Sequence, residues 1–210
     1  MFPLRDLVAA DVGPDAGRRD RHRIETRTHL ADAAVELFSE RGYEATSVDD
    51  IADAAGVSLR TFFRYFGGKD DVLFAREMDA GRFLSDLAQV PRDLTPVGAI
   101  HRAYVAQPPL STTDTQVHVL FHRAVGSSPT LQGRYLAGMQ QFREELATAL
   151  ARRDGRRRPT DTDRLAASVG RTVLDQAYVG WLTRGARGDL RRGVDTAFAR
   201  LATVCGASAP

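Results

Sequence analysis

The sequence predicts an all-α fold of about nine helices, and three observations lead to this prediction. Apolar residues recur at intervals of three to four positions, which is the spacing of one buried helix face. Glycine and proline clusters separate these periodic segments, and no segment shows the alternation typical of a half-buried strand. The chain of 210 residues has 43% hydrophobic and 27% charged residues, which suits a protein with a sizeable core.

The first predicted helix follows a short N-terminal stretch. Residues 1–17 contain Gly, Pro and Asp without helical periodicity, so we expect a disordered tail there. A helix is expected from about residue 19 to residue 41, because apolar residues such as Ala34 and Phe38 share one face. Gly42 is expected to end this helix, since glycine adopts the left-handed backbone that closes many helices.

A second helix is expected to start after Ser47. Ser47 and Asp50 have the spacing of a capping box, with Asp in the place of the more common Glu. The apolar residues that follow, Ile51 and Ala52, supply a buried face. We expect the helix to end at Gly56.

A third helix begins almost at once. Only Val57 separates the preceding glycine from Ser58, which is a favourable N-cap residue. The predicted helix over 58–65 is barely two turns long, and a helix of that length is not stable alone. We therefore expect it to dock on its neighbours through Phe62 and Phe66.

The remaining chain predicts a connecting helix and five further helices. The connecting helix is expected over 69–88, with Asp70 and Asp71 favourably placed at its positive N-terminal end. Proline and glycine then separate helices near 96–106, 112–125, 128–153, 161–185 and 189–204. We interpret the arginine-rich run at 152–159 as a solvated loop.

Two short helices joined by a tight glycine turn, after a longer helix, form a helix-turn-helix pattern. The third helix then presents its N-terminal half to the major groove, where side chains reach base edges. Arg60 and Arg64, one turn apart, are candidates for guanine or phosphate contacts. Leu59 and Thr61 are candidates for contact with a thymine methyl.

The distribution of charge supports a basic surface on this segment. The formal net charge is only +2, but acids dominate between residues 32 and 53. Residues 56–69 contain Arg60, Arg64 and Lys69 and no acid. Such an uneven charge distribution can present one basic face to a phosphate backbone even though the net charge of the protein is small. On charge alone, ordinary solvated helix faces remain an alternative interpretation.

The segment LADAAVELFSERGYEATSVDDIADAAGVSLRTFFRYFGGKDDVL resembles the DNA-binding region of the TetR family of bacterial transcriptional regulators. The resemblance runs over about Ile24–Leu73 and joins several motifs: "LF" followed by "RGY", then "IADAAGVS", then "TFFRYF" before a lysine. The combination is specific. The rest of the chain resembles the family only in being helical and of suitable length.

The resemblance implies a set of DNA contacts. It implies that Lys69, the only lysine of the chain, opens the connecting helix and contacts phosphate. Thr46 and Ser47 match family positions that touch the DNA backbone. The predicted DNA-binding residues are Thr46, Ser47, Ser58, Leu59, Arg60, Thr61, Arg64, Tyr65 and Lys69.

The chain departs from the family pattern at two places. The family commonly has tyrosine where Phe63 stands, and a phenyl ring cannot donate the hydrogen bond to phosphate. We expect Tyr65 to supply that contact instead. Gly67 and Gly68 replace the usual Pro or Ala and Ser or Thr, which predicts a less rigid start of the connecting helix.

The resemblance divides the chain into a helix-turn-helix DNA-binding domain at 18–68, a connecting helix at 69–88 and a ligand-binding and dimerisation domain at 89–205. Apolar stripes on the last two predicted helices suit a two-fold four-helix interface. The residues expected in it are Leu165, Val169, Val173, Leu174, Val194, Phe198 and Leu201. An internal core seam is the alternative interpretation.

A ligand pocket is expected among large or polar-tipped residues of the middle helices, although an ordinary core would use the same residues. The candidates are Phe83, Tyr104, His118, Phe121, His122, Tyr135, Met139, Phe142, Tyr178 and Trp181. Asp114, His118 and His122 lie at i, i+4 and i+8, a spacing that could hold a metal or an acidic ligand. A partly exposed polar face is the interpretation we favour, and no metal or cofactor is assigned.

We therefore expect a cytoplasmic, homodimeric transcriptional regulator, more specifically a repressor that binds a near-palindromic DNA operator and is released by an unknown small-molecule effector. A DNA-binding architectural or division-linked protein without a ligand switch is the alternative. The sequence shows no nucleophile–base pair or phosphate-binding loop, so an enzyme is not expected. No apolar run approaches the roughly 18 residues of a membrane span, so no membrane partner is expected. The single cysteine, Cys205, excludes an internal disulfide.

Overall fold

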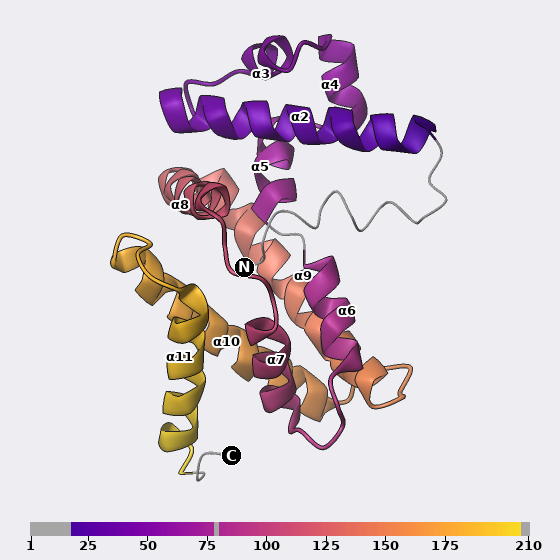
Figure 1. Cartoon of the computed structure of the whole chain (residues 1–210), viewed down its shortest axis with the longest axis vertical. Coiled ribbons are helices and arrows are strands. Elements are labelled where there is room, and N and C mark those ends of the chain that lie inside the picture. The colour runs from indigo at the N-terminus through magenta and orange to yellow at the C-terminus, as the bar shows by residue number, and fades with distance from the viewer. Residues whose placement is uncertain (1–17, 78–79, 207–210) are drawn as a thin grey trace. The chain divides into compact units, whose positions relative to one another are not determined.

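The computed structural model describes residues 18–77 and 80–206, and each regular element in these ranges is an α-helix (Figure 1). The all-α prediction is confirmed, with ten helices in the described residues. They are α2 (Arg18–Arg41), α3 (Val48–Ala54), α4 (Leu59–Tyr65), α5 (Lys69–Glu77), α6 (Gly81–Gln89), α7 (Pro96–Val105), α8 (Thr112–Ser127), α9 (Pro129–Arg153), α10 (Asp161–Thr183) and α11 (Leu190–Val204). The tail predicted at 1–17 lies outside the described residues.

The predicted connecting helix is not continuous. The described residues of helix α5 run to Glu77, and α6 begins at Gly81. Ala80, with φ −109° and ψ 9°, lies outside helical geometry and its side chain is buried. Gly81 follows directly, and glycine is among the least helix-favouring residues. The break therefore accounts for the tenth helix.

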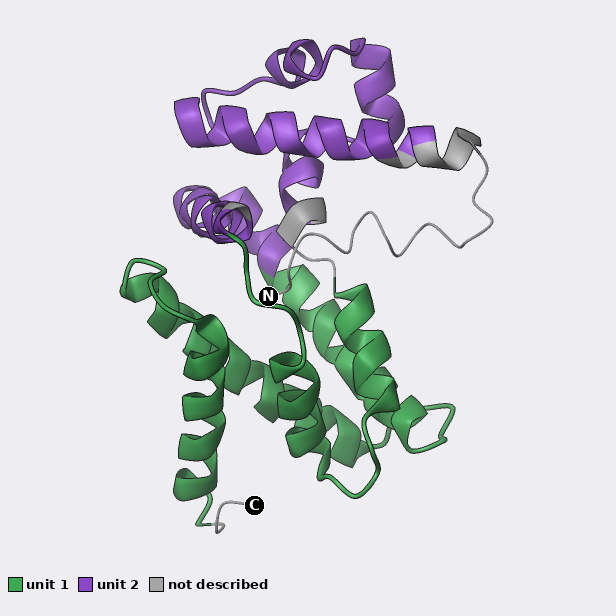
Figure 2. Cartoon of the chain, viewed as in Figure 1, with its two compact units in different colours: residues 1–3, 80–111, 136–210 green, residues 4–79, 112–135 purple. Residues whose placement is uncertain are grey.

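The chain folds into two compact units (Figure 2). The first contains the described residues 80–111 and 136–206, and the second contains 18–77 and 112–135. Helix α8 and the first turns of α9 thus belong with α2 to α5, which differs from the boundaries expected at residues 68 and 88. Helix α8 belongs to this unit because its apolar residues Phe121 and Ala124 pack in the same hydrophobic core as Phe74 of α5.

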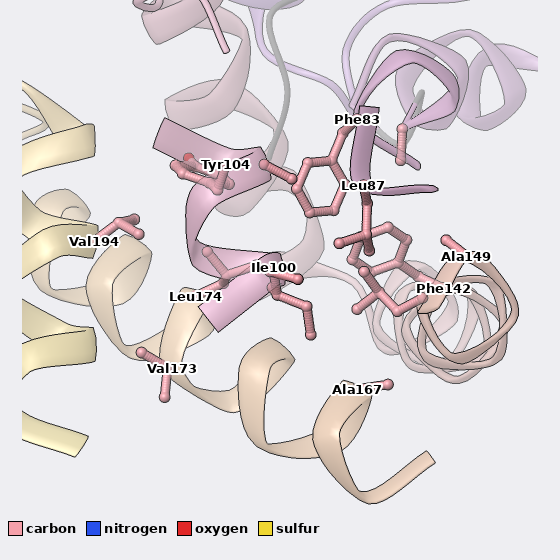
Figure 3. Close-up of a cluster of buried hydrophobic side chains, with 14 of the residues drawn as sticks. Phe83, Leu87, Ile100, Tyr104, Phe142, Ala149, Ala167, Val173, Leu174 and Val194 are labelled. Carbon is pink, nitrogen blue, oxygen red and sulfur yellow. The ribbon is translucent and has the colours of Figure 1, made fainter. Parts of the chain in front are cut away.

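The core of the first unit is built where α6, α7, α9 and α10 meet (Figure 3). Phe83 and Leu87 of α6 pack with Ile100 of α7 and Phe142 of α9. Helix α10 approaches α7 closely at Gly170, where an added Cβ would lie 2.6 Å from Ile100 Cδ1. The absence of a side chain at this position sets the distance between the two helices.

Most of the residues predicted for a dimer interface lie inside this unit instead. Val173, Leu174, Val194 and Phe198 are buried within the chain, because α10 and α11 pack against each other along one seam. The alternative interpretation, an internal core seam, is therefore correct for these four. Leu165 is different, since 66% of it is exposed.

The arginine-rich loop between α9 and α10 is more ordered than a solvated loop. Arg153 is buried and donates a hydrogen bond to the Leu94 carbonyl at 2.9 Å. Arg156 pairs with Asp154 and with Asp163, whose carboxylate also caps α10 by accepting from the Thr160 backbone N–H. The solvated-loop interpretation was wrong for these two arginines. The carbonyl that Arg153 binds lies far away in the sequence, and no sequence pattern marks the carboxylates that pair with Arg156.

No described helix has the length and apolar character that crossing a membrane requires.

Replacing Gly170 by Ala tests the close approach of α10 and α7. We expect Gly170→Ala to lower the free energy of unfolding by about 1–3 kcal/mol, because the new methyl overpacks against Ile100. The matched control is Gly180→Ala on the same helix, where the Cβ would meet only the flexible Arg184 side chain at 3.4 Å. That change should be neutral or stabilising by up to about 1 kcal/mol. Equal effects in urea unfolding would contradict the packing.

The capping carboxylate of α10 predicts a dependence of stability on pH. Hydrogen bonds from Arg156, with those from Thr160, hold the pKa of Asp163 below its ordinary value of 3.8. A depressed pKa stabilises the fold above the unfolded value, and the contribution is lost as the pH falls below about 3.8. Asp163→Asn should therefore cost about 1–3 kcal/mol near pH 7, and the deficit should shrink toward about pH 3.

Asp161→Asn is the matched control, because this carboxylate lies in the same first turn and its side chain is fully exposed. It should change the free energy of unfolding little at either pH. Urea unfolding across the range checks both variants, and a deficit for Asp163→Asn that stays constant to low pH would contradict the assignment.

Candidate nucleic-acid interface

Helix α4 has a buried face and an exposed face. Phe62 is 0% exposed and Phe66 is 4% exposed, and both join the core formed by α2, α3 and α5. Ser58 caps the helix, since its Oγ accepts from the Thr61 backbone N–H at 3.2 Å. The predicted docking face and N-cap are confirmed. Figure 1 shows α3 and α4 lying along one side of α2.

The turn between α3 and α4 is tight. Gly56 has φ +65°, the left-handed region that suits glycine. The Val57 N–H donates to the Ala52 carbonyl at 2.9 Å, which closes the turn. At the other end of α3, Ser47 and Asp50 form the predicted capping box. The helix-turn-helix geometry is therefore present as the sequence predicts.

The outer face of α4 is basic and partly apolar. Arg60 and Arg64 are exposed, and α4 contains no acidic residue. The Arg64 guanidinium lies 5.0 Å from the centre of the Tyr65 ring and donates to its hydroxyl at 3.3 Å. Leu59 is 39% exposed and Phe63 is 57% exposed. This face combines hydrogen-bond donors with apolar surface, the two kinds of group that major-groove edges accept.

Lys69 is bound to the protein's own backbone. Its ammonium donates to the carbonyls of Tyr43 at 2.8 Å, Glu44 at 3.3 Å and Thr46 at 3.0 Å. An ammonium has three N–H donors, so this arrangement uses all of them. The three carbonyls belong to the α2–α3 turn, whereas Lys69 begins α5. The lysine thus fixes the turn against the start of α5, and the phosphate contact implied by the resemblance does not follow from this geometry.

Tyr43 completes the surroundings of the ammonium. Its ring centre lies 4.4 Å from the Lys69 nitrogen, within the range of a cation–π contact. Burial, with the neighbouring carboxylates of Asp70 and Glu44, raises the pKa of Tyr43 to about 12. The ring therefore stays neutral at physiological pH.

Thr46 and Ser47, which the resemblance predicts to touch the DNA backbone, differ in exposure. Thr46 is 1% exposed, and its hydroxyl donates to the Gly42 carbonyl at 2.8 Å. A side-chain contact between Thr46 and DNA does not fit this burial, because closure of the α2–α3 turn occupies the hydroxyl. Ser47 is exposed beside it and keeps its place in the candidate interface.

A second network holds the joint before α5. The Gly67 N–H donates to the Asp71 carboxylate at 2.7 Å, so the Gly67–Gly68 joint is less free than its composition suggests. Arg134, in the first turns of α9, pairs with both Asp70 and Asp71, and its guanidinium lies 4.7 Å from the centre of the Phe74 ring. One arginine therefore links α9 to the beginning of α5.

The ten predicted pocket residues divide between the two units. Phe83, Tyr104, Met139, Phe142, Tyr178 and Trp181 belong to the first unit, and His118, Phe121, His122 and Tyr135 belong to the second. The ring centre of Phe83 lies 6.3 Å from those of Tyr104 and Phe142. In the second unit, the ring centre of Phe121 lies 5.6 Å from that of His122 and 5.7 Å from that of Tyr135.

The favoured interpretation of Asp114, His118 and His122 as a partly exposed polar face was wrong for the first two, whereas His122 is partly exposed. Asp114 is 3% exposed and His118 is 0% exposed, because α8 packs against α2 and α5. Across the described residues, no group of three His, Cys, Asp or Glu side chains is placed to hold a metal ion.

Sequence reasoning missed Tyr43, Asp71 and Arg134 as parts of the site. Tyr43 lies in the "RGY" motif, but nothing in that motif shows that its carbonyl accepts from a residue 26 positions later. Arg134 lies outside the helix-turn-helix segment and carries no local signal. These contacts depend on the packing of distant helices.

Substitution of Lys69 distinguishes a bond to the turn from a phosphate contact. We expect Lys69→Met to lower the free energy of unfolding by about 1–3 kcal/mol and to weaken DNA binding without changing its salt slope. Lys69→Arg keeps the charge, but a planar guanidinium cannot converge on three carbonyls as an ammonium does. It should therefore behave more like Lys69→Met than like the unaltered protein. A phosphate contact would instead give near-normal binding by Lys69→Arg and a slope lower by about one for Lys69→Met.

Comparison with known proteins agrees with this geometry. The pattern described as "Bacterial regulatory proteins, tetR family" matches residues 30–75, and that described as "MftR C-terminal domain" matches residues 94–206. The chain is 32% identical over 179 residues to MftR of Mycobacterium tuberculosis, described as a mycofactocin biosynthesis transcriptional regulator. That alignment covers 80% of this chain and 86% of MftR. The regulator TcmR of Streptomyces glaucescens is also 32% identical, over 78% of this chain and 77% of its own.

Solved structures show the same fold. A TetR-family regulator from Syntrophomonas wolfei has a TM-score of 0.61 and 19% identity, with 86% of this chain and 94% of that one covered. The fatty acid degradation regulator FadR from Bacillus halodurans has a TM-score of 0.51 and 24% identity, with 82% and 92% covered. The sequence matches, which span most of both chains, show more than the fold: this chain belongs to the TetR family of bacterial transcriptional regulators.

Proposed function

We propose that this protein is a homodimeric, ligand-responsive repressor that binds a near-palindromic operator through α4. The exposed, acid-free face of α4 carries this proposal, because it presents Arg60 and Arg64 to solvent while Phe62 and Phe66 anchor the helix. The DNA-contacting set that we propose is Ser47, Ser58, Leu59, Arg60, Thr61, Arg64 and Tyr65.

Dimerisation is supported by apolar surface that the chain leaves uncovered. On α10, Leu165 is 66% exposed and Val179 is 49% exposed, although the opposite side of the helix is buried. A two-fold contact over this outer side of α10 would give a dimer with two copies of α4. Two such helices about 34–36 Å apart would enter successive major grooves and select a near-palindromic site.

Release by an effector requires an element that connects the two units. Helix α9 is a single helix of 25 residues whose first turns belong to the second unit and whose remainder belongs to the first. Arg134 joins its beginning to Asp70 and Asp71 of α5. In the proposal, α9 can adopt two positions, and an effector that binds the protein more tightly in one of them also shifts α5 through this arginine. Differential affinity is essential, since equal binding to both states would shift nothing.

The similarity to MftR and TcmR supports a regulatory role but not a particular effector. The name of MftR refers to mycofactocin biosynthesis, so DNA upstream of such genes is a second candidate operator beside DNA upstream of this protein's own gene. The KstR repressor of Mycobacterium tuberculosis, 27% identical over 86% of this chain, favours repression over activation.

Fluorescence anisotropy on these two duplexes tests the proposal, with scrambled duplexes of equal length as controls. The proposal expects binding at least about 10³-fold tighter than to the scrambled DNA, and weaker binding once an effector is added. Specific binding that no effector changes would favour a DNA-binding protein without a ligand switch. Equal, steeply salt-dependent binding to all duplexes would contradict operator recognition.

Arg60→Ala tests the reading of bases by α4. The guanidinium is exposed on the outer face, so its loss should cost about 1–3 kcal/mol of operator affinity and relax the preference at one base pair. The matched control is Arg157→Ala, which removes the same charge from an exposed loop of the other unit. The control should bind the operator as the unaltered protein does. If both variants bind alike, the assignment of Arg60 to a base is wrong.

A further inference from the structure

Phe63 is an exposed aromatic side chain at the edge of the outer face of α4, next to the buried face. It is 57% exposed, whereas its neighbours Phe62 and Phe66 are almost fully buried. Its ring meets Phe62 only edge-on, with ring centres 5.5 Å apart and an interplanar angle of 83°. The phenyl ring therefore adds little to the core, and its surface is available to a partner.

The surroundings of Phe63 indicate what kind of partner it suits. Leu59, 39% exposed, lies one turn earlier on the same side of the helix, so the two form a short apolar strip. Arg60 lies three residues before Phe63 and Arg64 directly after it, and both are exposed. A second copy of α4 would bring like charges together, whereas a DNA duplex would bring phosphates to the arginines. Charge thus favours DNA over a second copy of this helix.

The chemistry of the ring narrows the contact further. A phenyl group neither donates nor accepts a conventional hydrogen bond, so it cannot replace a tyrosine hydroxyl on phosphate. Along the major groove, the C5-methyl of thymine is the one apolar group that a base edge presents. Insertion of an apolar side chain between base pairs is typical of minor-groove binders. Helix-turn-helix proteins place the helix that corresponds to α4 in the major groove, so insertion is not expected for Phe63.

We propose that Phe63 is a specificity-determining residue, and that its ring packs on the C5-methyl of one thymine in each operator half-site. The inference rests on the proposed function, because it requires α4 to lie in the major groove. Arg60 and Phe63 are separated by about 4.5 Å along the helix axis, from a rise of 1.5 Å per residue. Base pairs are about 3.4 Å apart, so the thymine lies one or two base pairs from the base that Arg60 contacts.

Deletion of single methyl groups from the DNA tests this contact. The full-length protein first selects its preferred duplex from a random pool. Each thymine of that duplex is then replaced in turn by deoxyuridine, which lacks only the C5-methyl. Affinities are measured for the unaltered protein, Phe63→Ala, Phe63→Tyr and Leu136→Ala. Leu136→Ala is the matched control, because it removes a 67% exposed apolar side chain from a helix other than α4.

At one thymine in each half-site, methyl removal should weaken the unaltered protein about four-fold, the effect of losing one buried methyl-sized group. Phe63→Ala should bind the thymine and deoxyuridine duplexes equally at that position. Phe63→Tyr keeps the ring, and Leu136→Ala leaves α4 intact, so both should retain the discrimination. Thermal unfolding of Phe63→Ala should match the unaltered protein, since the removed ring is mostly exposed.

Two results would overturn the inference. If Phe63→Ala weakens binding but the cost of methyl removal stays the same at every thymine, the ring contacts sugar or another group and does not read thymine. That result leaves the proposed function standing. If the protein selects no duplex over random DNA, operator recognition and the thymine contact are both wrong.

Discussion

The burial of Phe62 and Phe66 is the constraint on which the DNA-reading unit depends. Helix α4 has only seven residues, and so short a helix does not persist in water without tertiary contacts. Its two buried rings, one turn apart, join a core that includes Leu30 and Phe38 of α2. Once these rings point inward, Arg60 and Arg64 point to the opposite side of the helix, and Phe63 lies at the edge between the two faces. The same packing that makes the helix stable therefore determines which side chains are exposed for the proposed DNA contact.

The start of α5 explains why an arginine-rich protein uses one lysine. Three backbone carbonyls converge on the Lys69 ammonium, a geometry that suits a compact group with three donors and not a planar guanidinium. A cation at a helix N-terminus is unfavourable by itself, but the carbonyls and the acids Asp70 and Asp71 offset that cost. Lys69 thus connects the start of α5 to the α2–α3 turn, and Arg134 connects it to the first turns of α9.

Local signals predicted local structure well, and long-range contacts remained outside their reach. Ser47 with Asp50, Ser58 and Gly56 determine caps and turns through bonds between residues near in sequence, so the helix-turn-helix could be predicted almost residue by residue. The partners of Lys69 and Arg134 lie 23 or more residues away along the chain, and no spacing rule connects them. The inward side chain of Thr46 follows from closure of a turn whose path the sequence does not specify.

The C-terminal half shows a second limit of sequence patterns. An apolar stripe shows that a helix face is covered but does not identify what covers it. The apolar pattern at Val173 and Val194 therefore fitted a subunit interface as well as it fitted the internal seam that these residues form. The pocket candidates share this ambiguity, because Phe83 and Phe142 are core residues by burial whether or not a ligand also touches that core.

Chemical footprinting of the bound operator tests most directly whether the outer face of α4 reads DNA. Dimethyl sulfate methylates guanine N7 in the major groove and adenine N3 in the minor groove, so one experiment reports on both. If the outer face of α4 reads DNA, guanine N7 should be protected in two clusters whose centres are about 10–10.5 base pairs apart or a multiple of that distance, with adenine N3 unprotected at those positions. Protection confined to adenine N3, or no protection of guanine N7 in a tightly bound complex, would contradict this expectation.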